Sequence, residues 1–144
     1  MQKSQIKEKL KSAIQIYKKT KDPRASEVIE HLTKILSTSK SRDSLLDYAK
    51  HVYPGYKDPA HIKLIAKNLE LLEKGEINRL AVFMPPRHGK SMLCSEFFPA
   101  WYLGNNPKEF VIQSTYAQEL ADDFGRKVRN QIASPDFNSV FPQV

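Results

Sequence analysis

The sequence is poor in cysteine, with Cys94 alone, and it has no long apolar run. A single cysteine cannot form an internal disulfide, and it argues against a cysteine-based zinc site. No apolar stretch approaches the roughly 18 residues that a membrane span needs, and the N-terminus lacks the apolar core of a signal peptide. We therefore expect no membrane partner and a cytoplasmic location.

Low-complexity segments are also absent, and the five glycines and nine prolines are scattered among 40% hydrophobic residues. This composition excludes disordered and fibrous chains. A length of 144 residues leaves room for one compact globular domain and excludes a multidomain machine.

Positive charge is concentrated at the N-terminus. The formal net charge is +7, and residues 1–40 carry ten Lys and Arg against four Asp and Glu. Lys3, Lys7 and Lys11 recur every four residues, which places them along one side of a helix. This run is typical of a solvated helix face, and it is also compatible with contacts to nucleic acid phosphates. Both interpretations stay open.

The first half of the chain has helical periodicity. Apolar residues at helical spacing predict helices over 6–17 and 28–36, which together form a basic helical region, 1–40. The polar stretch 37–44 is typical of a linker. A third helix, capped by Asp43 or Ser44 and ending by Tyr53, and a fourth over 61–74 would form a helical lead-in, 41–75.

From residue 76 onward the pattern changes. The continuous apolar run at 80–84 predicts a strand buried on both faces, followed by a loop at 85–89 and a helix from Lys90. A second apolar run at 110–112 and a helix over 118–132 follow. The sequence thus predicts an α/β fold, in which 76–144 forms the first β-loop-α-β-α unit of a P-loop NTPase with an incomplete parallel sheet.

The loop before the predicted helix carries the clearest chemical signal. Gly89-Lys90-Ser91 matches the end of the phosphate-binding pattern G-x-x-x-x-G-K-[ST], although Met84 occupies the position of the first glycine. Gly89 would let the backbone approach a phosphate, Lys90 would bind the β- and γ-phosphates, and Ser91 would bind Mg²⁺. We therefore predict ATP and Mg²⁺ as cofactors. The predicted binding residues are Pro86, Arg87, His88, Gly89, Lys90, Ser91 and Met92.

Arg87 is a second candidate catalytic residue beside Lys90. Its guanidinium could reach a γ-phosphate and stabilise charge during phosphoryl transfer, or it could simply hold the loop by hydrogen bonds.

Across roughly residues 45–144 the sequence resembles the N-terminal part of the large terminase subunit, the DNA-packaging ATPase of tailed bacteriophages. The similarity rests on PPRHGKS at 85–91, SEFFPAWYLG at 95–104, STY at 114–116 and AQELADDFGRKVR at 117–129. Two upstream segments, 53–56 and 59–61, also resemble this family.

The resemblance implies an ATPase domain followed by a metal-dependent nuclease domain. It implies a γ-phosphate role for Arg87 and makes Ser114, Thr115 and Gln118 candidates for DNA contact. The implied partners are double-stranded DNA, the portal protein and the small terminase subunit. The complete motor would be a homo-oligomer in the cytoplasm of a bacterial host.

The sequence has no later strand ending in Asp-Glu, which such ATPases use to hold Mg²⁺ and activate water. We therefore expect a truncated enzyme with little activity alone.

Two alternatives come from the same residues. A helicase-like P-loop ATPase would share the loop. A non-catalytic module that grips DNA or a partner through its basic helical arm would share the charge distribution.

Overall fold

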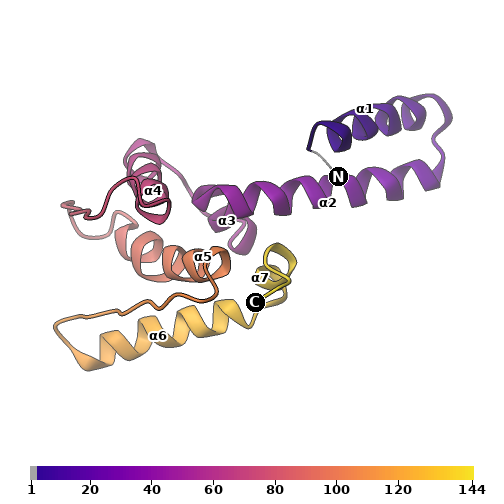
Figure 1. Ribbon diagram of the computed structural model, residues 1–144. Helices are drawn as coiled ribbons and strands as arrows, with labels where there is room; N and C mark the ends of the chain where they lie inside the picture. The colour runs from indigo at the N-terminus through magenta and orange to yellow at the C-terminus, as the bar shows by residue number, and fades with distance from the viewer. Residues whose placement is uncertain (1–2) are drawn as a thin grey trace. The chain divides into compact units, whose positions relative to one another are not determined.

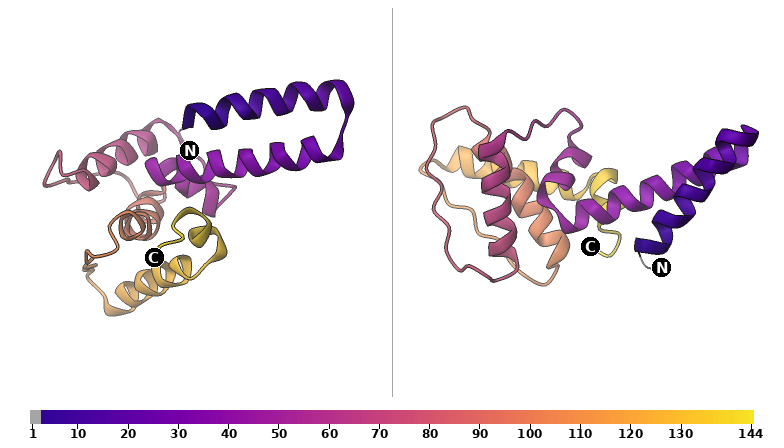
Figure 2. Two further views of the ribbon diagram at one scale, coloured as in Figure 1. Left: turned by 45° about the vertical axis from the view of Figure 1, so that its right-hand side comes forward. Right: turned by 90° about the horizontal axis from the view of Figure 1, so that it is seen from above.

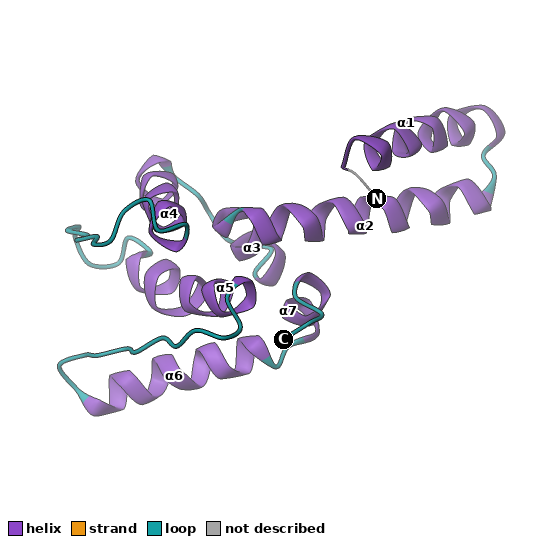
Figure 3. Ribbon diagram, in the orientation of Figure 1, coloured by secondary structure: helices purple, strands orange, loops and turns teal. Residues whose placement is uncertain are grey.

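Helices account for all the regular secondary structure of residues 3–144, which are the residues that the computed structural model describes (Figures 1 and 3). The elements are α1 (Lys3–Thr20), α2 (Pro23–Asp43), α3 (Leu45–Val52), α4 (Ala60–Glu73), the π-helical segment η1 (Met92–Phe97), α5 (Phe98–Asn105), α6 (Gln118–Ile132) and α7 (Pro135–Val140). The chain divides into two units, one ending at Lys40 and the other running from Ser41 to Val144.

The first unit is a helical hairpin, with α1 lying alongside the N-terminal part of α2 in the views of Figures 1 and 2. It buries Ile6 and Ala13 of α1 and Leu32 of α2. Lys21 takes a left-handed backbone conformation with φ of 49° in the turn between the helices. Asp22 Oδ1 accepts a hydrogen bond from the Arg24 N–H at 2.9 Å, which satisfies one free N–H at the start of α2.

The predicted linker at 37–44 is wrong, because α2 continues through it to Asp43. The hydroxyls of Ser37 and Thr38 donate to the Lys34 carbonyl at 2.8 and 3.1 Å. Serine and threonine hydroxyls that bond back to the preceding turn are compatible with a helix, so a polar composition alone did not indicate a break.

The second unit encloses one hydrophobic core, to which all of its helices contribute. At its centre Trp101 of α5 is only 1% exposed, and its indole N–H lies 3.1 Å from the carbonyls of both Ser41 and Arg42. Beside it, the Phe141 ring packs against Tyr48 and Phe137 with centroid distances of 5.9 and 5.0 Å.

Local signals placed the ends of α3, α4 and α6 correctly, whereas α7 was not predicted. Ser44 caps α3 through its side chain, which accepts a hydrogen bond from the Asp47 N–H, and α4 is followed by Gly75 with φ of 72°. The prediction of a helix over Gln118–Ile132 is confirmed as α6, which buries Phe124 and Val128 one turn apart.

The predicted α/β fold is wrong, because no strand occurs among residues 3–144. The apolar runs at 80–84 and 110–112 lack regular secondary structure and run as loops in Figure 3. A strand exists only when a neighbouring strand accepts and donates its backbone hydrogen bonds. The two runs form no backbone hydrogen bonds with each other.

Exposure shows that these runs are covered on one side at most. Leu80 packs against the core, whereas Phe83 is 93% exposed. In the second run Phe110 and Ile112 are 91% and 93% exposed. The sequence predicted that the run at 80–84 is buried on both faces. In the structure helices cover at most one face of each run.

Candidate functional site

The predicted phosphate-binding loop forms a tight turn that leads directly into a helix. The loop turns at Pro86 and Arg87, bends at His88 and Gly89, and becomes helical at Lys90. Arg87 and Gly89 both have left-handed backbone angles, with φ of 65° and 83°. Such an angle is costly for an arginine, so the surrounding contacts must hold this conformation.

Two histidines supply these contacts. The His88 ring folds back, so that Nδ1–H donates to the Pro86 carbonyl at 2.8 Å. His61, in the first turn of α4, donates from Nε2 to the His88 carbonyl at 3.3 Å. The two rings meet edge to face with centroids 5.9 Å apart. The loop is thus tied both to itself and to α4.

Gly89 suits its position because its φ of 83° lies where side chains are strained. An added Cβ would lie 3.4 Å from Ile62 Cδ1, so the loop packs against α4 at this residue.

The start of the helix presents free backbone donors. The Leu93 N–H donates to the Gly89 carbonyl at 3.2 Å, which closes the first helical turn. The N–H groups before this turn have no partner within the helix, and the helix dipole adds positive potential at this end. Arg87, His88 and Ser91 are exposed here, and Lys90 is half-buried. This arrangement can bind an anion.

Behind the loop the environment is apolar. Burial raises the pKa of the Cys94 thiol, and the positive charge of Lys90 offsets part of this increase. Burial also raises the pKa of Tyr56 to about 12, with smaller contributions from the charges of Cys94 and Asp58. Both groups are therefore neutral at pH 7, and Lys90 supplies positive charge near Cys94.

Two of the predicted DNA-contact residues, Ser114 and Thr115, lie in the second loop, 106–117, and Gln118 is the first residue of α6. Ser114 and Gln118 are exposed, whereas Thr115 is half-buried and donates from Oγ1 to the Ala117 carbonyl at 2.6 Å. This loop and the phosphate loop lie on the same side of the second unit in Figures 1 and 2.

Gln113 joins the second loop to the helix that starts at Lys90. Its side-chain amide donates to the Ser95 carbonyl at 2.7 Å. In a regular α-helix the N–H of residue 99 would fill that carbonyl, but Pro99 has no N–H, and the turn before it is π-helical. Gln113 replaces the missing donor.

Sequence reasoning did not predict the hydrogen bonds that His61 and Gln113 form. His61 lies 27 residues from its partner His88, and Gln113 lies 18 residues from its partner Ser95, so no local pattern links them. A signal did exist for Gln113, because Pro99 leaves the carbonyl four residues earlier without a donor. For His61 the one indication was that segment 59–61 resembles the terminase family.

Among residues 3–144 no group of three or more His, Cys, Asp or Glu side chains is arranged to hold a metal ion. In the same range no helix combines the length and hydropathy required to cross a bilayer. Comparisons with protein-family models, curated proteins and solved structures give no match for this chain.

Proposed function

We propose that the loop at 86–92 binds the phosphates of ATP with Mg²⁺. The observation that carries this proposal is the constrained loop, left-handed at Arg87 and Gly89, that ends at a helix beginning with Lys90 and Ser91. A loop of this kind directs backbone N–H groups and a lysine toward the same anion.

The residues present fit this ligand. The unpaired amides at the helix start donate to phosphate oxygens, and the Lys90 ammonium provides a charge-assisted contact. Ser91, exposed at the second helical position, offers a hydroxyl ligand to Mg²⁺. Bound Mg²⁺ would neutralise charge on the phosphate oxygens. Arg87, also exposed, has a side chain long enough to reach the terminal phosphate.

At the level of the whole protein, we propose a role in ATP-driven packaging of double-stranded DNA. The resemblance of residues 45–144 to the large terminase subunit supports this proposal, as does the exposure of Ser114 and Gln118. The portal protein and the small terminase subunit are the proposed protein partners, and the proposed motor is a homo-oligomer in the cytoplasm of a bacterial host.

A binding titration tests the nucleotide site. We expect the protein to bind a fluorescent ATP analogue with Mg²⁺, and Lys90→Ala to weaken this binding at least tenfold, which corresponds to about 1.4 kcal/mol. Lys108→Ala is the matched control, because it removes the same charge just beyond the other end of the same helix. Equal effects of the two variants would refute a specific site.

Mg²⁺ dependence tests the role of Ser91. Ser91→Ala should weaken binding of the analogue with Mg²⁺ while leaving binding in EDTA unchanged. An equal loss under both conditions would assign Ser91 to the phosphates instead of the metal ion.

The charge of the first unit favours DNA binding as a second function. Residues 1–40 carry ten Lys and Arg against four Asp and Glu. If the lysine row of α1 contacts phosphates, affinity for duplex DNA should fall steeply with salt, and Lys7→Gln with Lys11→Gln should reduce the slope by roughly 2. Lys90→Ala should leave this affinity unchanged. An unaltered slope in the double variant would exclude the lysine row.

A further inference from the structure

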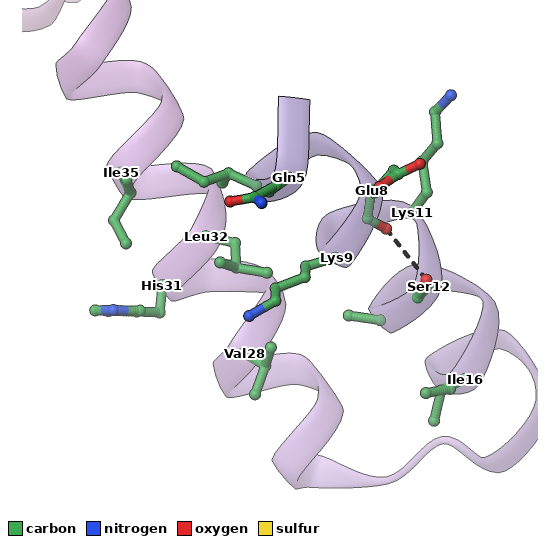
Figure 4. Close-up of a pocket in the computed structure, with 12 residues that line it drawn as sticks. Gln5, Glu8, Lys9, Lys11, Ser12, Ile16, Val28, His31, Leu32 and Ile35 are labelled. Atoms are coloured by element: carbon green, nitrogen blue, oxygen red, sulfur yellow. Dashed lines mark hydrogen bonds between the residues drawn. The ribbon is translucent and has the colours of Figure 1, made fainter. Parts of the chain in front are cut away.

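A long groove runs between α1 and α2 within the first unit, and its apolar side chains have no part in the nucleotide or DNA proposals. The groove has a volume of about 1310 Å³ and is lined by residues from Gln5 to Ile16 on α1 and from Val28 to Ile35 on α2 (Figure 4). It therefore extends along most of the hairpin.

The groove contains an apolar strip to which both helices contribute. Ile6, Ala13 and Leu32 line it and are buried, whereas Ile16 and Val28 line it with 53% and 48% of their surface exposed. Exposed aliphatic side chains above buried ones form a hydrophobic strip, and contact between this apolar surface and water is unfavourable. Two helices of this length also bury too little surface to form a complete core by themselves.

The dimensions suit one more helix. Eight residues of α1 between Gln5 and Ile16 line the groove, and at 1.5 Å per residue this segment of the helix spans roughly 17 Å. About three helical turns match this length. A helix with apolar residues at i, i+3 or i+4, and i+7 would place one side chain against each turn of the groove.

The charge of the groove selects the kind of helix. Lys9, Lys11 and His31 line it together with a single acidic residue, Glu8, and Figure 4 shows the Lys9 side chain extending toward α2. The whole unit has the same excess of positive charge. A second copy of this hairpin would bring like charges together, and a nucleic acid would leave the apolar strip uncovered.

We propose that the groove between α1 and α2 is the docking site for an amphipathic helix of a partner protein, about three turns long, whose apolar face is flanked by Asp and Glu. Its apolar residues cover Ile16 and Val28, and its carboxylates face the lysines. Docking converts the hairpin into a three-helix bundle.

Fluorescence anisotropy with the full chain tests this site. The probes are two labelled 15-residue peptides with the same leucine stripe at helical spacing, one flanked by glutamates and the other by lysines. We expect the glutamate peptide to bind at least tenfold more tightly than the lysine peptide. Ile16→Asp should weaken binding of the glutamate peptide at least tenfold.

Gln15→Asp is the matched control, because it adds the same charge to an exposed neighbouring position that does not line the groove. It should change the affinity less than twofold, and circular dichroism should show that both variants keep their helix content. Absence of binding, equal binding of both peptides, or equal effects of the two variants would overturn the proposal. So would a dimer in light scattering that Ile16→Asp dissociates, because a second copy would then occupy the groove.

Discussion

Among the glycines of the second unit, Gly104 has the least room for an added side chain. It is the penultimate residue of α5, and a Cβ added to it would lie 2.5, 2.6 and 2.7 Å from three atoms of the Phe141 ring. Carbon atoms in contact are normally about 3.5–4.0 Å apart. Gly104→Ala therefore requires the ring or α5 to move by roughly 1 Å.

The Phe141 ring has little freedom to move. It is 3% exposed, contacts the rings of Tyr48 and Phe137, and has the Arg42 guanidinium 5.9 Å from its centroid. Overpacking of this kind costs about 1–3 kcal/mol, and three clashing atoms place the cost near the upper value. Alanine is favoured over glycine by up to about 1 kcal/mol inside a helix. We expect a net loss of about 2 kcal/mol in the free energy of unfolding.

Gly125→Ala in α6 is the matched control, because a Cβ there meets no atom within 4 Å. It should raise the free energy of unfolding by about 0.5–1 kcal/mol. Urea denaturation followed by circular dichroism at 222 nm measures both values. If Gly104→Ala is as stable as Gly125→Ala, the described packing of α5 against Phe141 is incorrect.

Three further variants test individual contacts. The Tyr56 hydroxyl is buried without a hydrogen-bond partner in the described structure, so Tyr56→Phe should leave the urea midpoint unchanged or raise it, and a loss above about 1 kcal/mol would reveal a missing partner. A hydrogen bond from Lys50, 2.8 Å away, holds the pKa of Asp58 below its ordinary value of 3.8. The stability from this pair is present above pH 3.8 and is lost as the pH falls through the lower pKa of the folded state. Lys50→Met should therefore reduce the fall in the free energy of unfolding below about pH 4. If urea titrations show the same pH dependence in both proteins, the pair does not contribute to stability. Gln113→Leu should lower the free energy of unfolding by about 1 kcal/mol, because it leaves the Ser95 carbonyl without its donor; hydrogen exchange should then be faster around η1, and unchanged exchange would contradict the link.

The sequence predicted best what depends on neighbours along the chain. The Ser44 cap, the end of α4 before Gly75 and the bounds of α6 follow from side chains within a few residues of each helix end. The error at 37–44 was also local, because Ser37 and Thr38 can bond to the preceding helical turn as readily as they can form a turn.

Long-range features were predicted least well. The runs at 80–84 and 110–112 have strand composition, but strand formation depends on pairing, which their composition does not specify. For the loop, the residue types indicated anion binding, whereas the support from His61 and the bond from Gln113 depend on packing between distant segments. The positive φ of Arg87 had no sequence signal.

The buried position of Trp101 has a practical consequence for every experiment described above. It is the only tryptophan in the chain, and its indole bonds to carbonyls at the C-terminal end of α2. Intrinsic fluorescence excited at 295 nm therefore reports on one known contact, between α5 and the end of α2. Emission should be blue-shifted while that contact holds and move to longer wavelength when α2 separates from α5, which gives the protein a built-in optical sensor at the beginning of its second unit.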